Sequence, residues 1–143
     1  MGATAAGTED LRGPAERLGF QRENVVLELG YDDDCDDDLR AAIEAVTGTT
    51  LVDEDYEDVA DVVLLWWRED DGDLADALVD ALSAVDDGGI IWLLTPKAGR
   101  EGHVEPSDIA EAAPTAGLSA TKSTAAAASW AGTRLVAPRV HRR

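Results

Sequence analysis

Four runs of apolar residues along the chain have the length and continuity of buried strands. They cover residues 25–29 (VVLEL), 51–53 (LVD), 59–67 (VADVVLLWW) and 90–96 (IIWLLTP). A strand with one face in water alternates apolar and polar residues, whereas most of these runs are nearly continuous. The pattern therefore predicts a sheet that is covered on both faces.

Between these runs, apolar residues recur at the three- and four-residue spacing of helices. The first such stretch follows residues 36–38, ends at Gly48 and has the apolar positions Leu39, Ala42, Ile43 and Val46. The second follows Asp73, is closed by a turn at residues 86–89 (DDGG), and has the apolar positions Leu74, Ala77, Leu78, Ala81, Leu82 and Val85. The third starts at Pro106 and ends or bends at Pro114, with Ile109, Ala112 and Ala113 facing inward. Strands that alternate with helices predict an α/β fold.

The two ends of the chain complete the predicted domain. Residues 1–13 are small and polar and predict a flexible N-terminus, whereas Pro14 opens a short helical turn anchored by Leu18 and Phe20. Residues 119–124 and 133–136 alternate as two antiparallel strands do, and residues 139–143 form a basic tail. The expected organisation is one domain over residues 14–138.

One connection departs from the usual geometry of parallel sheets. Only about eight residues separate Asp53 from the centre of the next strand, whereas a parallel crossover normally takes a dozen or more. The pattern favours an extended crossover without a helix. The alternative is that these two strands are not parallel.

Charge is distributed unevenly along the chain, whose formal net charge is -18. Residues 1–95 hold 26 acids and 5 bases, a net of -21, and residues 96–143 hold 4 acids and 7 bases, a net of +3. Such a negative surface repels nucleic acid and anionic lipid, so we expect neither as a partner. A basic protein partner, bound cations and simple solubility remain as explanations.

Other features predict a soluble cytoplasmic protein. Cys35 is the only cysteine, so neither an intrachain disulfide nor a zinc site made of cysteines can form. The first residues lack the basic and apolar order of a secretion signal, and no apolar run approaches the roughly 18 residues of a membrane span.

The strand sequences together resemble a known fold. VVLELG, the acid Asp53 after the second run, DVVLLWW, GGIIWLLTP and the final antiparallel pair are similar to the class I methyltransferase fold, shortened by one strand and its flanking helices. LVDEDY, DVVLLWWR, LLTPKAGREGHVEPSDI and AAPTAGL further resemble an actinobacterial family known as domain of unknown function 3052. The resemblance covers nearly all of the chain after residue 17. It implies a single Rossmann-like α/β domain with a mostly parallel sheet, helices on both faces and a C-terminal antiparallel strand pair.

The resemblance also implies where a cofactor would bind. In methyltransferases a glycine-rich turn after the first strand approaches S-adenosylmethionine, and an acid after the second strand holds its ribose. Gly30 and Asp53 match these positions, but residues 31–35 (YDDDC) add side chains where the ligand's methionine part would lie. Ligands of open α/β sheets bind at the carboxyl ends of the strands, so the cofactor-binding candidates also include Thr95, Lys97 and Arg100.

The aspartate cluster at residues 32–38 has three interpretations. A solvated loop at a helix start is favoured, and a divalent cation or a basic partner are the alternatives. The metal candidates are Asp32, Asp34 and Asp36. The cluster is not an EF-hand, because the sixth position, Asp37, is not glycine and the twelfth, Ile43, is not glutamate.

No catalytic residues can be assigned from the sequence. His103 and His141 lie in a predicted loop and tail, and the neighbouring acids disfavour a Cys35 thiolate. Trp66, Trp67 and Trp92 are expected in the core, with Trp66 and Trp67 on opposite faces, and Trp130 is expected to be partly exposed.

Two functional hypotheses follow. The favoured one is a non-catalytic methyltransferase-like domain for interaction or regulation that uses its acidic face. The alternative is a protein that binds S-adenosylmethionine or another nucleotide-like ligand at the carboxyl edge of the sheet, with Asp53 on the ribose and Lys97 nearby, and that could be a methyltransferase. The sequence identifies no cofactor.

Overall fold

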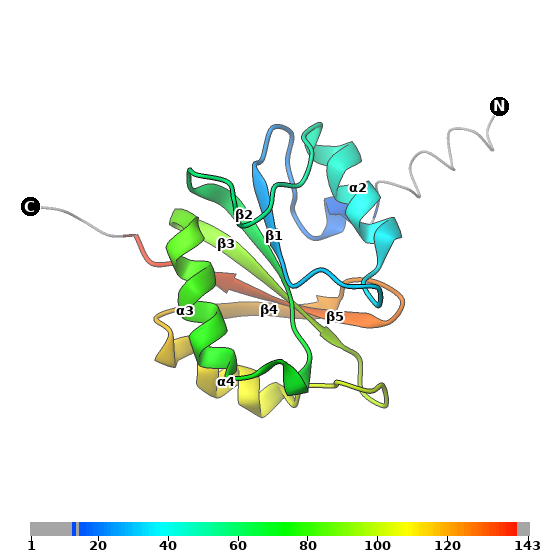
Figure 1. The fold of residues 1–143 in the computed structure, drawn as a ribbon, viewed down its shortest axis with the longest axis vertical. Helices are drawn as coiled ribbons and strands as arrows, with labels where there is room; N and C mark the ends of the chain where they lie inside the picture. The colour runs from blue at the N-terminus through cyan, green and yellow to red at the C-terminus, as the bar shows by residue number, and fades with distance from the viewer. Residues whose placement is uncertain (1–12, 14, 140–143) are drawn as a thin grey trace, which may run out of the picture.

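The computed structural model describes residue 13 and residues 15–139 (Figure 1). Residues 1–12 of the predicted flexible N-terminus, the predicted helix start at Pro14 and residues 140–143 of the basic tail therefore lie outside the described residues. The elements are β1 (Val26–Leu29), α2 (Asp37–Thr47), β2 (Ala60–Trp66), a short 3-10 helix (Glu69–Asp71), α3 (Leu74–Ala84), β3 (Val85–Pro96), α4 (Pro106–Thr115), β4 (Ser119–Ala125) and β5 (Trp130–Val136). None of the helices in this part of the chain is long and apolar enough to span a bilayer.

The strands form one sheet in the order β1-β2-β3-β5-β4. Strands β1, β2 and β3 are parallel, whereas β5 runs antiparallel to β3, and β4 runs antiparallel to β5. The predicted fold is confirmed: a Rossmann-like α/β sheet that starts parallel and ends in an antiparallel pair.

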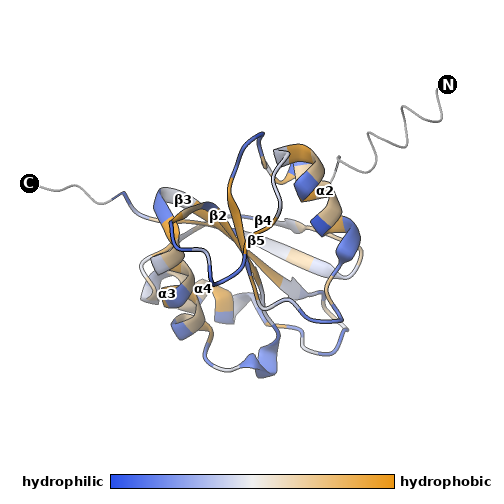
Figure 2. Ribbon diagram, turned by 45° about the horizontal axis from the view of Figure 1, so that its top comes forward, coloured by the Kyte–Doolittle hydropathy of each residue, from blue (hydrophilic) through white to orange (hydrophobic). Residues whose placement is uncertain are grey.

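Helices cover both faces of the sheet, as the continuous apolar strands predicted (Figures 1 and 2). Helix α2 and the segment before β1 cover one face, which we call the α2 face, and α3 and α4 cover the other, which we call the α3 face. Side chains of β2 alternate between them: Trp66 is buried on the α2 face, and the next residue, Trp67, packs on the α3 face. The predicted opposite orientation of these tryptophans is confirmed, as are the buried anchors Leu18 and Phe20.

The predicted helices form where their end signals lie. The side chain of Asp36 accepts a hydrogen bond of 2.8 Å from the backbone N–H of Leu39 and caps α2, which ends at Gly48 in a left-handed conformation (φ 74°). Asp73 caps α3 in the same way through the N–H of Asp76. Helix α4 ends one residue after Pro114.

The predicted strand at residues 51–53 is wrong. Only Val52 forms a bridge, parallel to Leu27, and it lies on the opposite side of β1 from β2. Because five of the six residues 53–58 are acids, the chain has too few apolar positions here to add a strand. Residues 53–59 cross β1 without a helix, as expected. Within the described part of the chain, the backbone of β1 is therefore unpaired along its outer edge except at the bridge to Val52.

Two further predictions need correction. Residues 86–89 form a bulge within β3, because the pairing jumps from Ala60–Val85 to Val62–Ile90, so they are not a turn before the strand. Trp130 is only 1% exposed, because β5 lies between β3 and β4. Its ring meets that of Trp66 edge to face, with the ring centroids 4.9 Å apart.

Candidate functional site

Gly30 ends β1 at the carboxyl edge of the sheet, and its backbone explains why it is glycine. It has a left-handed conformation (φ 80°), and a Cβ atom there would lie 2.3 Å from the carbonyl oxygen of Trp66. The close neighbour that excludes a side chain is therefore the adjacent strand. Gly30 matches the methyltransferase pattern, but the fold itself already requires it.

Arg68 fills the loop that follows Gly30. It donates from Nη1 to the Gly30 carbonyl (2.8 Å) and from Nε to a carboxylate oxygen of Asp34 (3.0 Å), and its Nη2 forms an ion pair with Asp34. Its guanidinium also lies 5.3 Å from the ring centroid of Trp130 and contacts the sulfur of Cys35. We call Arg68 and Asp34 the latch, because they join the end of β2 to the loop between β1 and α2.

The latch and the burial of Cys35 determine the protonation of two side chains in this loop. The hydrogen bond that Arg68 donates to Asp34 is the main reason why the pKa of Asp34 is lowered, and the same bond raises the pKa of Arg68. Burial raises the pKa of the Cys35 thiol to about 11. Asp34 is therefore charged and Cys35 is a neutral thiol at physiological pH, which makes Cys35 a poor nucleophile.

The structure brings some of the other cofactor candidates together. Lys97 (backbone N–H, 3.0 Å) and Arg100 (Nη1, 3.1 Å) both donate to the carbonyl of Ser129, and the charge of Arg100 also helps to lower the pKa of Asp34. Thr95, by contrast, is 3% exposed inside the sheet. Asp53 accepts a hydrogen bond of 3.0 Å from the N–H of Asp55 and so stabilises its own turn.

The three metal candidates have separate tasks. Asp34 belongs to the latch, Asp36 caps α2, and Asp32 accepts from the N–H of Asp33 at 2.7 Å. Within the described residues, no three Asp, Glu, His or Cys side chains lie close enough to hold a metal ion together. This geometry gives the metal hypothesis no support.

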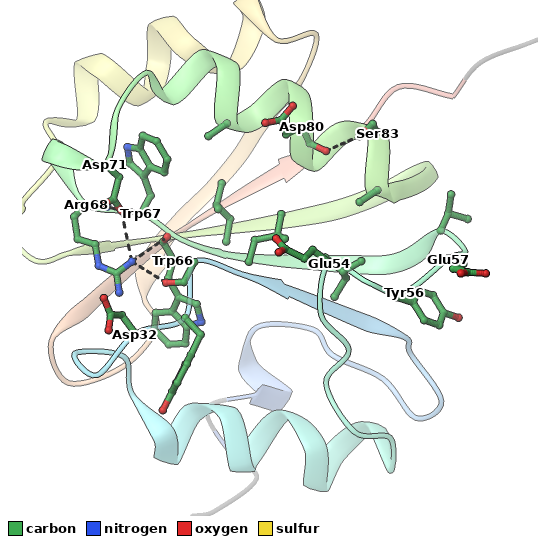
Figure 3. A pocket seen from close by; sticks show the side chains of 18 of the residues that line it. Asp32, Glu54, Tyr56, Glu57, Trp66, Trp67, Arg68, Asp71, Asp80 and Ser83 are labelled. Carbon is green, nitrogen blue, oxygen red and sulfur yellow. Dashed lines mark hydrogen bonds and ion pairs between the residues drawn. The ribbon is translucent and has the colours of Figure 1, made fainter.

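A cleft of about 820 Å³ opens on the α3 face, between α3 and residues 53–59 (Figure 3). One end reaches Gly30 and Arg68, and its apolar lining includes Leu27, Leu29 and Leu65 from the sheet and Trp67 after β2. Six acids also line it: Asp32, Glu54, Glu57, Asp58, Asp71 and Asp80. The cleft exists because residues 51–59 form neither a strand beside β1 nor a helix over it.

Sequence reasoning missed both Arg68 and this cleft. Arg68 directly follows the longest apolar run, so its position at a carboxyl end was the available signal. Trp67 was expected in the core, but it is only partly buried and lines the cleft.

The fold defines a structural class, that of the methyltransferase fold. The glycopeptide N-methyltransferase MtfA in complex with sinefungin is 14% identical, with a TM-score of 0.59 over 92% of this chain and 94% of that one. A methyltransferase from Pyrococcus furiosus is 12% identical, with a TM-score of 0.52 over 89% of this chain and 83% of that one. At these identities the likeness concerns the fold alone.

Within that class, the sequence defines a particular family. Residues 15–139 match the family described as "Protein of unknown function (DUF3052)", and the chain belongs to it. The uncharacterized protein Rv2239c of Mycobacterium tuberculosis is 50% identical over 138 residues, which cover 96% of this chain and 87% of that protein. The uncharacterized protein Mb2263c of Mycobacterium bovis has the same identity and coverage.

Proposed function

We propose that this protein is a non-catalytic domain with a methyltransferase-like fold that acts by binding another protein, in the cytoplasm. The observation that carries the proposal is the latch. Arg68 and Asp34 occupy the loop after Gly30, where the methionine part of a methyltransferase cofactor would need to lie.

A ligand would have to displace the latch at an energetic cost. Removing Arg68 from its place leaves the Gly30 carbonyl and the Asp34 carboxylate without this partner, and because both groups are exposed to water, each loss costs below about 1 kcal/mol. The carboxylate of S-adenosylmethionine would also approach the acids of residues 32–34. Both effects disfavour the cofactor.

The groups near the cleft support a non-catalytic role. No His, Cys or Lys side chain is among the residues that line it. His103 instead has its Nδ1 2.9 Å from the carbonyl oxygen of Pro96, and its Nε2 faces Glu105 at 3.8 Å. The hydroxyl of Ser83, which lines the cleft, donates to the backbone carbonyl of Asp80 at 2.7 Å rather than to a carboxylate that could act as its base.

A second candidate function is the binding of S-adenosylmethionine or a related nucleotide-like ligand. The observation in its favour is that the cleft reaches Gly30 and that its volume, about 820 Å³, lies in the range of small-molecule sites. In this case the ligand would lie along the α3 face, beside the latch.

Isothermal titration of S-adenosylmethionine and S-adenosylhomocysteine into the full chain separates the two functions. Our proposal predicts no saturable heat up to about 1 mM ligand, whereas a dissociation constant in the micromolar range would establish the second function. The variant Arg68→Ala opens the loop. Arg134→Ala is the matched control, because Arg134 on β5 donates to Thr121 on β4, at the other edge of the sheet from β1. Binding gained only in Arg68→Ala would identify the latch as the obstacle.

A further inference from the structure

The cleft on the α3 face exposes apolar surface that the rest of the molecule does not cover. Three large apolar side chains in the described residues are strongly exposed, and two of them, Tyr31 (47%) and Val59 (45%), line this cleft. Tyr31 lies at the carboxyl edge of the sheet together with Leu29 and Trp67, whereas Val59 directly precedes β2. Exposed apolar surface that is continuous and bordered by polar residues is typical of interaction sites.

The charges around this apolar surface are almost all negative. Asp80 projects from α3 on one side, and Glu54 and Glu57 project from the facing segment, all of them exposed (Figure 3). Arg68 is the only base in the lining, and its charge is shared between Asp34 and Asp71, whose carboxylate is 3.5 Å away. An occupant therefore meets an uncompensated field of acids.

The acids do not converge on one point. Within the described residues they form no group able to hold a metal ion, and they stand on both sides of the cleft. A small ligand with one charge is held by a few convergent polar groups, whereas separated acids match several positive charges carried along a chain. The distribution therefore favours a polypeptide over a small organic cation.

We infer that this cleft docks a short cationic amphipathic segment of another protein. Its apolar side covers Leu29 and Trp67, and its Lys or Arg side chains reach Asp80 on one side and Glu54 and Glu57 on the other. The cleft follows α3 from Ala77 to Ala84, two helical turns or about 10 Å, which matches a segment of about two to three turns. The inference rests on the proposed function and adds to it the site and the chemistry of the partner.

The probe for this inference is a fluorescein-labelled amphipathic peptide of about 12 residues, made of Lys and Leu at helical spacing. The control peptides are a scrambled Lys/Leu sequence of equal charge and a Glu/Leu sequence of equal pattern. Fluorescence anisotropy with the full chain at about 0.15 M salt is expected to show saturable binding of the amphipathic peptide, at least tenfold tighter than binding of the scrambled one. No binding, or equal binding of both basic peptides, overturns the inference.

Matched protein variants locate the site. The triple variant Glu54→Gln, Glu57→Gln and Asp80→Asn removes three acids from the cleft, and Asp70→Asn, Asp87→Asn and Glu101→Gln remove three exposed acids that do not line it. The first variant should weaken peptide binding at least tenfold and the second no more than threefold. Equal losses would show attraction by overall charge and overturn the inference.

A further variant tests the apolar lining independently of charge. Ala77→Phe fills the cleft from α3 at a partly buried position, and it should weaken peptide binding about tenfold while the melting temperature confirms folding. Unchanged binding in a folded variant overturns the inference. Titration of S-adenosylhomocysteine into the same samples reports on the proposed function separately, because micromolar binding there contradicts that function whatever the peptide does.

Discussion

The two faces of the sheet differ in how completely they bury the side chains at the end of β2. On the α2 face, Trp66 is fully buried, and its indole N–H donates to Glu28 at 2.8 Å. On the α3 face, the next residue, Trp67, is only partly buried and lines an open cleft. The last residue of β2 and the residue that follows it thus belong to a closed core and to an open surface.

The difference shows which part of the molecule is available for binding. The polar groups of the α2 face are paired with one another, since Glu28 also accepts from Arg40 at 2.7 and 2.9 Å, and the indole N–H of Trp130 donates to the Asp34 carbonyl. The α3 face leaves apolar side chains uncovered beside exposed acids such as Glu54, Glu57 and Asp80. We therefore expect stability to depend on the first face and partner binding on the second.

The largest expected contrast is between the two tryptophans. Trp66→Ala should lower the free energy of unfolding by about 4 kcal/mol, because it empties a fully buried site, and Trp67→Ala should lower it by about 1 kcal/mol. Urea denaturation measures both. Equal losses would show that the two faces are equally closed, and Trp66→Phe provides a folded intermediate if the alanine variant does not fold.

The next effect concerns the polar group inside the closed face. Glu28 has a side chain that is 8% exposed and three hydrogen bonds from Arg40 and Trp66, so Glu28→Gln should lower the free energy of unfolding by about 2 kcal/mol. Asp37→Asn is the control: its bond to Arg40 is 3.3 Å long and its carboxylate is 70% exposed, so its loss should be below about 0.5 kcal/mol. A large loss in the control would place the stabilising charge at the surface.

A smaller effect is expected at the latch, and it depends on pH. Arg68→Gln should lower the free energy of unfolding by about 1 kcal/mol at pH 7. The pKa of Asp34 is lower in the folded state than its ordinary value, so the ion pair stabilises the fold above about pH 4 and loses this effect as pH falls through the folded pKa. The difference between wild type and variant should therefore shrink from pH 7 to pH 3. A difference that grows at low pH would contradict the latch.

The smallest effect is that of salt. Repulsion among the acids of residues 1–95 should weaken the fold at low ionic strength, so the melting temperature should rise by about 1–2 °C between 10 and 300 mM sodium chloride, which corresponds to about 0.5 kcal/mol. Thermal melts followed by circular dichroism measure it. A constant melting temperature would show that the acids are already neutralised by nearby partners.

Much of the fold could be predicted because strong local signals agree. The apolar runs at residues 25–29, 59–67 and 90–96, the aspartates at the starts of two helices and the stop at Gly48 each specify one element, and the structure confirms them. The predictions that failed concern residues whose burial depends on parts of the chain that are distant in sequence. Trp130 is buried by Trp66 and by the strands on either side of β5, which no local pattern reveals.

The candidate site was harder to predict than the fold. Gly30 and Asp53 fit a family pattern, but their contacts show local tasks, a close approach to Trp66 and a turn at Asp55. Arg68 joins Asp34 across 34 positions of sequence, so its pairing depends on the order of the strands. The cleft arises from a strand that does not form, and an absence of this kind leaves no positive signal in a single sequence.

One measurement tests the central claim, that the loop after Gly30 is closed and the α3 face is open. The indole N–H signals of the four tryptophans, assigned in nitrogen-15 spectra of the full chain, report on both places at once. The Lys/Leu peptide should move the signal of Trp67 and leave Trp66, Trp92 and Trp130 in place, and S-adenosylhomocysteine should move none. The claim would be contradicted if S-adenosylhomocysteine shifted the signals of Trp130 and Trp66 saturably and the peptide left the signal of Trp67 unchanged.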